Sequence, residues 1–210
     1  MAGAVELEQQ MIERGLSSLG IAFGRTQVEQ LLGLAHLLER WSGRMNLTGH
    51  RDLDAILRRL VLESAALCGA IPTTSSVVDL GSGAGFPGLP IAILRPTCRV
   101  TLVESRERRH HFQRTAIRTL QLENVQAVRG RIEDRPSAHG LVIAQALAGP
   151  DRVLELMVPW AKPGGWIALP QTESGQRSIH HPDVESIDTR AYRSPAGGPP
   201  RSVWLGRRSE

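Results

Sequence analysis

A glycine-rich turn that follows a short apolar run is the part of the sequence best suited to chemistry. The run Ser76–Leu80 leads directly into Gly81, Gly83 and Gly85. Glycines in such a turn let the backbone approach a ligand closely and adopt angles closed to other residues. Asp79 stands two residues before the first of these glycines, so a carboxylate is held beside whatever the turn binds. The pattern predicts a small-molecule site whose ligand must tolerate a negative charge.

The spacing of the glycines narrows the choice of ligand. A dinucleotide fingerprint would need glycine where Phe86 stands, and no Gly-Lys-Ser/Thr follows, which excludes a P-loop. A carboxylate at Asp79 would repel a pyrophosphate, but it would favour the ammonium and sulfonium groups of S-adenosylmethionine. We therefore predict S-adenosylmethionine as cofactor and S-adenosylhomocysteine as product.

Two later segments are suited to hold the rest of this cofactor. Glu104 ends the next apolar run, where an acid can accept hydrogen bonds from both ribose hydroxyls. After the third run, Ile132 could cover the adenine face while Arg131 and Glu133 fix the loop or the ring edge. The alternatives are a solvated acid at a strand end and an exposed charged turn.

The elements that must position these residues begin with helices. Apolar residues recur at helical spacing over Thr26–Trp41, and a second helical stretch runs from about Asp52 to Leu67. Thr26 with Glu29 resembles a capping box that would open the first of these helices. We expect residues 1–72 to form a helical extension packed on the core.

From residue 73 onward, short apolar runs alternate with helical segments. This alternation predicts a mostly parallel sheet with helices on both faces, the Rossmann-like α/β fold of class I methyltransferases, as one domain over residues 73–210. The tail is expected to add an antiparallel hairpin at the sheet edge, formed by Asp183–Tyr192 and Ser202–Leu205. The predicted strands are Ser76–Leu80, Arg99–Glu104, Asn124–Val128, Gly140–Ala144 and Gly165–Leu169, and the predicted helices are Gly88–Leu94, Arg106–Leu120 and Asp151–Trp160.

The composition indicates a cytoplasmic protein without metal. No apolar run has the length of a membrane span, and the first residues do not resemble a secretory signal. Cys68 and Cys98 form neither a disulfide framework nor a metal-ligand pattern, and the histidines lack zinc-ligand spacing.

The charge balance suggests a nucleic-acid partner. The net charge is +4, the pI is about 10.0, and Lys162 is the only lysine. Arginine binds phosphates through two parallel hydrogen bonds, although an arginine-rich composition can also be a property of the genome. Candidate RNA-binding side chains lie near the N-terminal helices and after Glu104, with an ordinary solvated face as the alternative for both groups. They are Arg44, Arg51, Arg59, Arg108 and Arg109.

Three sequence strings resemble the RsmG family, also called glucose-inhibited division protein B. They are VDLGSGAGFPGLP at Val78–Pro90, MNLT at Met45–Thr48 and KPGG at Lys162–Gly165. The resemblance implies a bacterial enzyme that makes 7-methylguanosine in small-subunit ribosomal RNA, with ribosomal RNA or the small subunit as partner. It also implies a set of cofactor contacts at the glycine turn and at the ends of the next two strands. The expected set is Asp79, Gly81, Ser82, Gly83, Gly85, Phe86, Glu104, Ser105, Arg131, Ile132 and Glu133.

The sequence departs from the family pattern on the substrate side. The family's Ser-Arg-Ala after the fourth strand is Ala144-Gln145-Ala146 here, and its Leu-Lys-Gly after the fifth strand is Leu169-Pro170-Gln171. N7 of guanine carries a lone pair and no proton, so methyl transfer needs no general base, and the catalytic residues stay unassigned, with Gln145 and Arg131 as substrate-side candidates. The departures leave two alternatives to rRNA methylation: a diverged enzyme acting on another RNA or a small molecule, and a weakly active cofactor-binding protein that docks to a ribosomal partner. The oligomeric state is open, with a monomer as the default.

Overall fold

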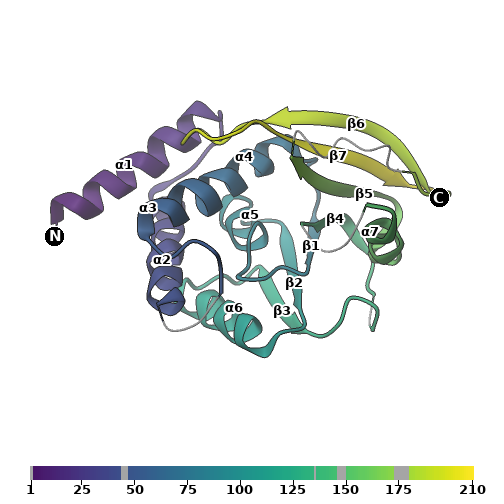
Figure 1. Cartoon of the computed structure of the whole chain (residues 1–210), viewed down its shortest axis with the longest axis horizontal. Coiled ribbons are helices and arrows are strands. Elements are labelled where there is room, and N and C mark those ends of the chain that lie inside the picture. The colour runs from purple at the N-terminus through teal and green to yellow at the C-terminus, as the bar shows by residue number, and fades with distance from the viewer. Residues whose placement is uncertain (1, 44–46, 135, 146–149, 173–179) are drawn as a thin grey trace.

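A twisted seven-stranded sheet forms the centre of the computed structural model, which describes residues 2–43, 47–134, 136–145, 150–172 and 180–210 (Figure 1). The strand order is β3-β2-β1-β4-β5-β7-β6. The first five strands run parallel to one another, and β7 pairs antiparallel with both β5 and β6. The strands are β1 (Ser76–Leu80), β2 (Arg99–Glu104), β3 (Val125–Arg129), β4 (His139–Ala144), β5 (Ala161–Thr172), β6 (Val184–Tyr192) and β7 (Arg201–Arg208). This arrangement confirms the predicted mostly parallel α/β sheet with an antiparallel C-terminal hairpin.

Helices precede β1 and connect β1 to β2, β2 to β3 and β4 to β5. Among the described residues before β1, every regular element is a helix, as the apolar spacing predicts. The helices are α1 (Ala2–Ser18), α2 (Arg25–Ser42), α3 (Leu53–Ile56), the π-helical η1 (Leu57–Val61), α4 (Leu62–Ala70), α5 (Gly88–Leu94), α6 (Glu107–Thr119), α7 (Pro150–Met157) and the 3-10 helix η2 (Val158–Trp160).

Two details of the sequence prediction are wrong. Helix α2 begins after Gly24, whose backbone N–H donates to Gln27 Oε1 at 2.6 Å, so the cap is not formed by Thr26 with Glu29. Strand β5 is longer than Gly165–Leu169 because its far end pairs with β7 as far as Thr172 opposite Arg201. The extra pairing partner lies far away in the sequence, so local periodicity does not indicate it.

The two faces of the sheet carry separate apolar cores. One core contains Phe112 of α6, Leu89 of α5 and Leu34 of α2 together with β1 and β2 side chains. The other contains Leu154 and Met157 of α7 and Trp160 of η2, packed on β4 and β5. Figure 1 shows α7 on the opposite side of the sheet from α2, α4, α5 and α6. The sheet is therefore covered on both faces, as parallel strands require.

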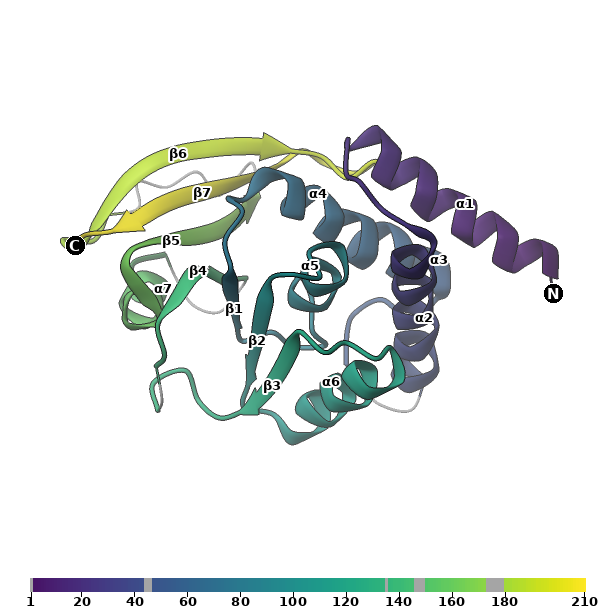
Figure 2. The same cartoon turned by 180° about the vertical axis from the view of Figure 1, so that it is seen from behind.

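Helix α1 packs against the rest of the chain through buried apolar residues. Ile12 and Leu16 are fully buried in the same core as α2 and β1. His36 of α2 lies 3.1 Å from Glu8 Oε2 of α1, which joins the two helices by a polar contact as well. Figure 2 shows α1 and the C-terminal end of β7 at opposite ends of the molecule. This core includes residues from both 1–72 and 73–210. The division of the chain into a helical extension and a methyltransferase domain at residue 72 stays a prediction.

Across the described ranges, none of the helices combines the length and apolar character that crossing a bilayer would take.

Candidate active site

The glycine turn lies at the carboxyl end of β1, between β1 and α5. Gly81, Gly83 and Gly85 have φ angles of 69°, 56° and 87°, in the left-handed region that favours glycine. The turn is fixed to the neighbouring strand, because the N–H groups of Gly81 and Ser82 donate to the carbonyl of Val103 at 2.9 and 3.1 Å. The glycines are thus required by the backbone conformation, as the sequence pattern predicts.

Asp79 lies beneath the turn and is almost completely buried. Its Oδ2 accepts a hydrogen bond of 2.9 Å from the N–H of Gly88 at the start of α5. Burial raises the pKa of the carboxyl group to about 7, the hydrogen bond from Gly88 opposes this, and the nearby charge of Glu104 adds to it. Asp79 therefore connects β1 to α5, and its charge depends on pH near neutrality.

Glu104 ends β2 next to the turn and is held by backbone donors. Its Oε2 accepts from the N–H of Gly83 at 3.0 Å, and its Oε1 accepts from the N–H of Arg106 at 2.7 Å. Arg109 Nη1 lies 3.8 Å from Oε2, and the whole residue is only 4% exposed. Since a carboxylate has about four acceptor positions, Glu104 keeps acceptor capacity for a ligand.

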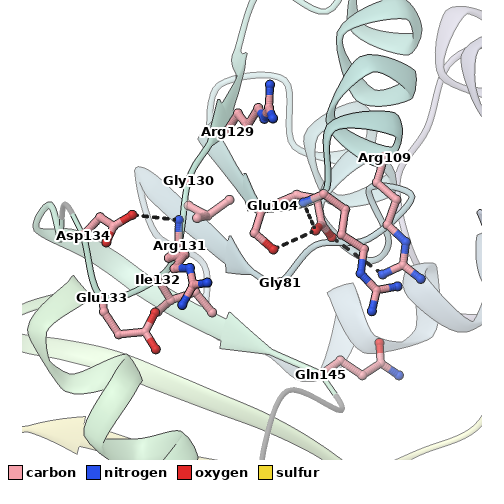
Figure 3. Close-up of a pocket in the computed structure, with 13 residues that line it drawn as sticks. Gly81, Glu104, Arg109, Arg129, Gly130, Arg131, Ile132, Glu133, Asp134 and Gln145 are labelled. Carbon is pink, nitrogen blue, oxygen red and sulfur yellow. Dashed lines mark hydrogen bonds and ion pairs between the residues drawn. The ribbon is translucent and has the colours of Figure 1, made fainter.

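A cavity of about 820 Å³ opens above the ends of β1, β2, β3 and β4. Figure 3 shows the 131–134 segment on one side of this cavity and Arg109 on the other, with Glu104 between them. The residues that line it are Gly81, Val103, Glu104, Ser105, Arg106, Arg109, Arg129, Gly130, Arg131, Ile132, Glu133, Asp134 and Gln145.

The structure brings together only part of the predicted cofactor set around this cavity. Gly81, Glu104, Ser105 and the Arg131–Glu133 segment line it. The lining does not include Asp79, Ser82, Gly83, Gly85 or Phe86, which belong to the turn and its support. Phe86, for example, packs against the apolar core beside α5.

The segment after β3 is held in place by Trp160, which belongs to the core that contains α7. Trp160 Nε1 donates to the carbonyl of Ile132 at 3.0 Å, and the Arg131 N–H donates to Asp134 Oδ2 at 3.2 Å. Ile132 also packs on the core that contains Trp160. The sequence reasoning missed this role of Trp160, because Ile132 and Trp160 are far apart along the chain.

Gln113 is a second residue that the sequence reasoning missed. Its side chain is fully buried, and its Nε2 donates to Ser82 Oγ and to the Gly83 carbonyl, both at 2.8 Å. The available signal was an amide between Phe112 and Ala116 on the buried face of α6, where apolar residues are expected.

The arginines proposed for RNA binding do not form one group. Arg109 faces Glu104 in the cavity, while Arg108 is exposed on the first turn of α6. Arg59 is exposed on η1, and its guanidinium fills the space above Gly198 in the turn between β6 and β7. Arg51 is exposed just before α3, and Arg44 lies outside the described residues.

The two positions that depart from the family pattern, Gln145 and Pro170, lie in different surroundings. Gln145 is exposed at the end of β4 and lines the cavity, whereas Pro170 pairs with Val203 inside the sheet. Of these positions, Gln145 is the one that can contact a ligand in this cavity.

The chain is similar to a known protein family over most of its length. The family model described as rRNA small subunit methyltransferase G matches residues 27–189. A Ribosomal RNA small subunit methyltransferase G of Chromohalobacter salexigens is 33% identical over 201 residues, covering 94% of this chain and 96% of that protein. The protein of the same name from Methylobacillus flagellatus is 33% identical over 186 residues, covering 85% and 90% of the two chains.

Solved structures show the same fold at low sequence identity. M. jannaschii TYW2 in complex with AdoMet superposes with a TM-score of 0.58 at 16% identity, covering 79% of this chain and 78% of that one. A SAM dependent methyltransferase from Aquifex aeolicus gives a TM-score of 0.53 at 17% identity, covering 72% and 92%. The predicted Rossmann-like methyltransferase fold is therefore confirmed.

Proposed function

This chain belongs to the rRNA small subunit methyltransferase G family, and on that basis we propose that it uses S-adenosylmethionine to methylate N7 of a guanine in small-subunit (16S) ribosomal RNA. The observation that carries the proposal is the cavity at the carboxyl ends of β1 and β2, with Glu104 beside the glycine turn. In open α/β sheets, ligands bind outside these strand ends, where the strand order reverses.

The residues around the cavity fit the proposed cofactor. Its volume of about 820 Å³ lies within the range of roughly 300–1,000 Å³ that is typical of ligand pockets. Glu104 can accept from the ribose hydroxyls, and Ile132 can cover the adenine ring. At a pH above its pKa of about 7, the carboxylate of Asp79 would be ionised and would favour the ammonium group.

The proposed mechanism depends on positioning. When bound, S-adenosylmethionine would supply an electrophilic methyl group and would leave as S-adenosylhomocysteine. Because N7 of guanine carries a lone pair and no proton, no side chain would have to remove a proton. The protein then contributes orientation and electrostatic stabilisation of the purine, which becomes cationic. Gln145 at the cavity rim can donate a hydrogen bond to a guanine carbonyl, but it lacks the charge of an arginine.

The partner and its location follow from the same proposal. We infer that the small ribosomal subunit, or its RNA, presents the guanine in the cytoplasm, and that the protein acts as a monomer. The net charge of +4 supports an RNA partner, and almost all of the positive side chains are arginines.

The test is methyl transfer to small ribosomal subunits that lack the family's modification. The purified protein is incubated with isotope-labelled S-adenosylmethionine, and the digested nucleosides are analysed by mass spectrometry. We expect labelled 7-methylguanosine, lost in an Asp79→Ala variant that keeps its fold. If a known family enzyme is active on the same subunits and this protein is not, the proposed substrate is wrong.

A further inference from the structure

Gln113 connects helix α6 to the glycine turn through a single amide group. Its Nε2 contacts two acceptors in the turn, Ser82 Oγ and the Gly83 carbonyl, each at 2.8 Å. Ser82 Oγ in turn donates to the Val103 carbonyl at 3.3 Å. The amide thus fixes the part of the turn that lies against the end of β2.

The same part of the turn holds Glu104. The N–H of Gly83 donates to Glu104 Oε2 at 3.0 Å, while the carbonyl of Gly83 accepts from Gln113. Gly83 has a φ of 56°, a left-handed conformation that glycine adopts without strain, so the hydrogen bonds to its N–H and its carbonyl are what fix its position. A change in the position of Gly83 would therefore change the position of the Glu104 carboxylate.

Arg109 lies one helical turn before Gln113 and faces the same carboxylate. Its Nη1 is 3.8 Å from Glu104 Oε2. Residues four apart on a helix share one face, so α6 approaches the turn and Glu104 with both side chains. The neighbours of Gln113 along this buried face are the apolar Phe112 and Ala116.

The Gln113 side chain is not explained by packing alone. Among the described residues, its Oε1 is buried and has no hydrogen-bond partner. A buried acceptor without a hydrogen bond lowers the stability of the folded protein, whereas an apolar side chain of the same size as Gln113 would carry no such penalty. The amide nitrogen, in contrast, makes both of its hydrogen bonds, and both go to the turn.

We propose that Gln113 is a positioning residue for the cofactor: it holds Gly83 so that the Glu104 carboxylate faces the ribose hydroxyls. The inference rests on the proposed function, since it assigns the ribose to Glu104. Gln113 does not line the cavity, so its effect on binding would pass through Gly83 and Glu104.

The test compares Gln113→Met with the wild type in calorimetric titrations with S-adenosylmethionine. Methionine matches glutamine in length and removes both hydrogen bonds to the turn. We expect the affinity to fall about five- to tenfold. In methylation assays, the KM for S-adenosylmethionine should rise by the same factor, with kcat unchanged at saturation. Gln126→Met is the matched control, because Gln126 is exposed on β3 and the same change there should have no effect.

A double-mutant cycle with Glu104→Gln tests whether the effect passes through Glu104. In the Glu104→Gln background, Gln113→Met should weaken binding less than twofold, since the carboxylate that it positions is gone. Full additivity, or an unchanged affinity of Gln113→Met alone, would overturn the inference. Thermal unfolding shows whether each variant is folded. If Gln113→Met does not fold, the same titration is made with Gln113→Asn, whose side chain is too short to reach the turn. A wild type that fails to bind S-adenosylmethionine contradicts the proposed function itself.

Discussion

The chemistry of single residues at this site is governed by burial. Asp79 is 1% exposed, and its pKa of about 7 lies far above the ordinary value of an aspartate. In the folded protein the carboxyl group keeps its proton up to near neutral pH, whereas in the unfolded chain it loses the proton near pH 3.8. Between these values the folded state binds more protons, so this group makes the protein less stable as the pH rises.

We therefore expect Asp79→Asn to remove a pH-dependent loss of stability. Asparagine can still accept from the Gly88 N–H without being charged. Between about pH 5 and 7, the free energy of unfolding of the wild type should fall relative to that of the variant by roughly 1.4 kcal/mol per pH unit. Denaturant titrations at several pH values measure this difference, with the exposed Asp183→Asn as control. Parallel curves for wild type and Asp79→Asn would contradict the assignment.

Also at the residue scale, Gln145 and Pro170 stand where the resemblance to the family leads us to expect an arginine and a lysine. Gln145→Arg together with Pro170→Lys should raise the initial rate of rRNA methylation several-fold. The arginine would place a positive charge in the lining of the cavity, where it favours a cationic purine bound beside phosphates, and the lysine would add a second charge on the neighbouring strand β5. Gln126→Arg with Pro182→Lys adds the same two charges at exposed positions elsewhere and should have a smaller effect. A lower rate in the first variant would indicate a substrate other than rRNA guanine.

At the scale of elements, the site depends on a contact between η2 and the segment after β3, both of which pack on the same core. The segment after β3 lies over the cavity, and it is held by Trp160 of η2 through the Ile132 carbonyl. Trp160 itself is buried in the core beneath α7. The position of Ile132, and with it the proposed adenine contact, is therefore set by an element on the opposite side of the sheet from α6.

Trp160→Phe should weaken S-adenosylmethionine binding several-fold. Phenylalanine keeps the apolar packing and removes the hydrogen bond to Ile132, which contributes about 1 kcal/mol. Trp204→Phe is a matched control, since it removes an equivalent bond of 3.0 Å to Ser186 Oγ in the C-terminal hairpin. Calorimetry should show equal affinity for that control and the wild type; equal weakening in both variants would mean that the effect is a general loss of stability.

At the scale of the whole molecule, the N-terminal helices and the sheet share one core. Leu16 of α1 and Leu34 of α2 are fully buried in the cluster that also holds Leu102 of β2 and Phe112 of α6. A shared core of this kind couples the unfolding of α1 to that of the sheet.

Leu16→Ala should therefore lower the stability of the whole chain. Truncating a fully buried leucine costs about 2–5 kcal/mol, and we expect a single transition whether it is followed by helix content or by tryptophan fluorescence. Leu7→Ala on the same helix is the control, because Leu7 is 68% exposed. Two separate transitions would mean that residues 1–72 unfold as an independent unit.

The sequence by itself determined the fold class, the succession of strand, glycine turn and helix, and the family. These follow from local patterns: apolar periodicity, left-handed positions filled by glycine, and the string Val78–Pro90. Only the tertiary structure decided which side chains meet at the cavity. It brought Trp160 to Ile132 and Gln113 to Gly83, it placed Arg109 beside Glu104, and it extended β5 along β7. The physical reason is that these contacts join residues distant in sequence, and their geometry depends on how helices pack on the sheet, which no local pattern encodes.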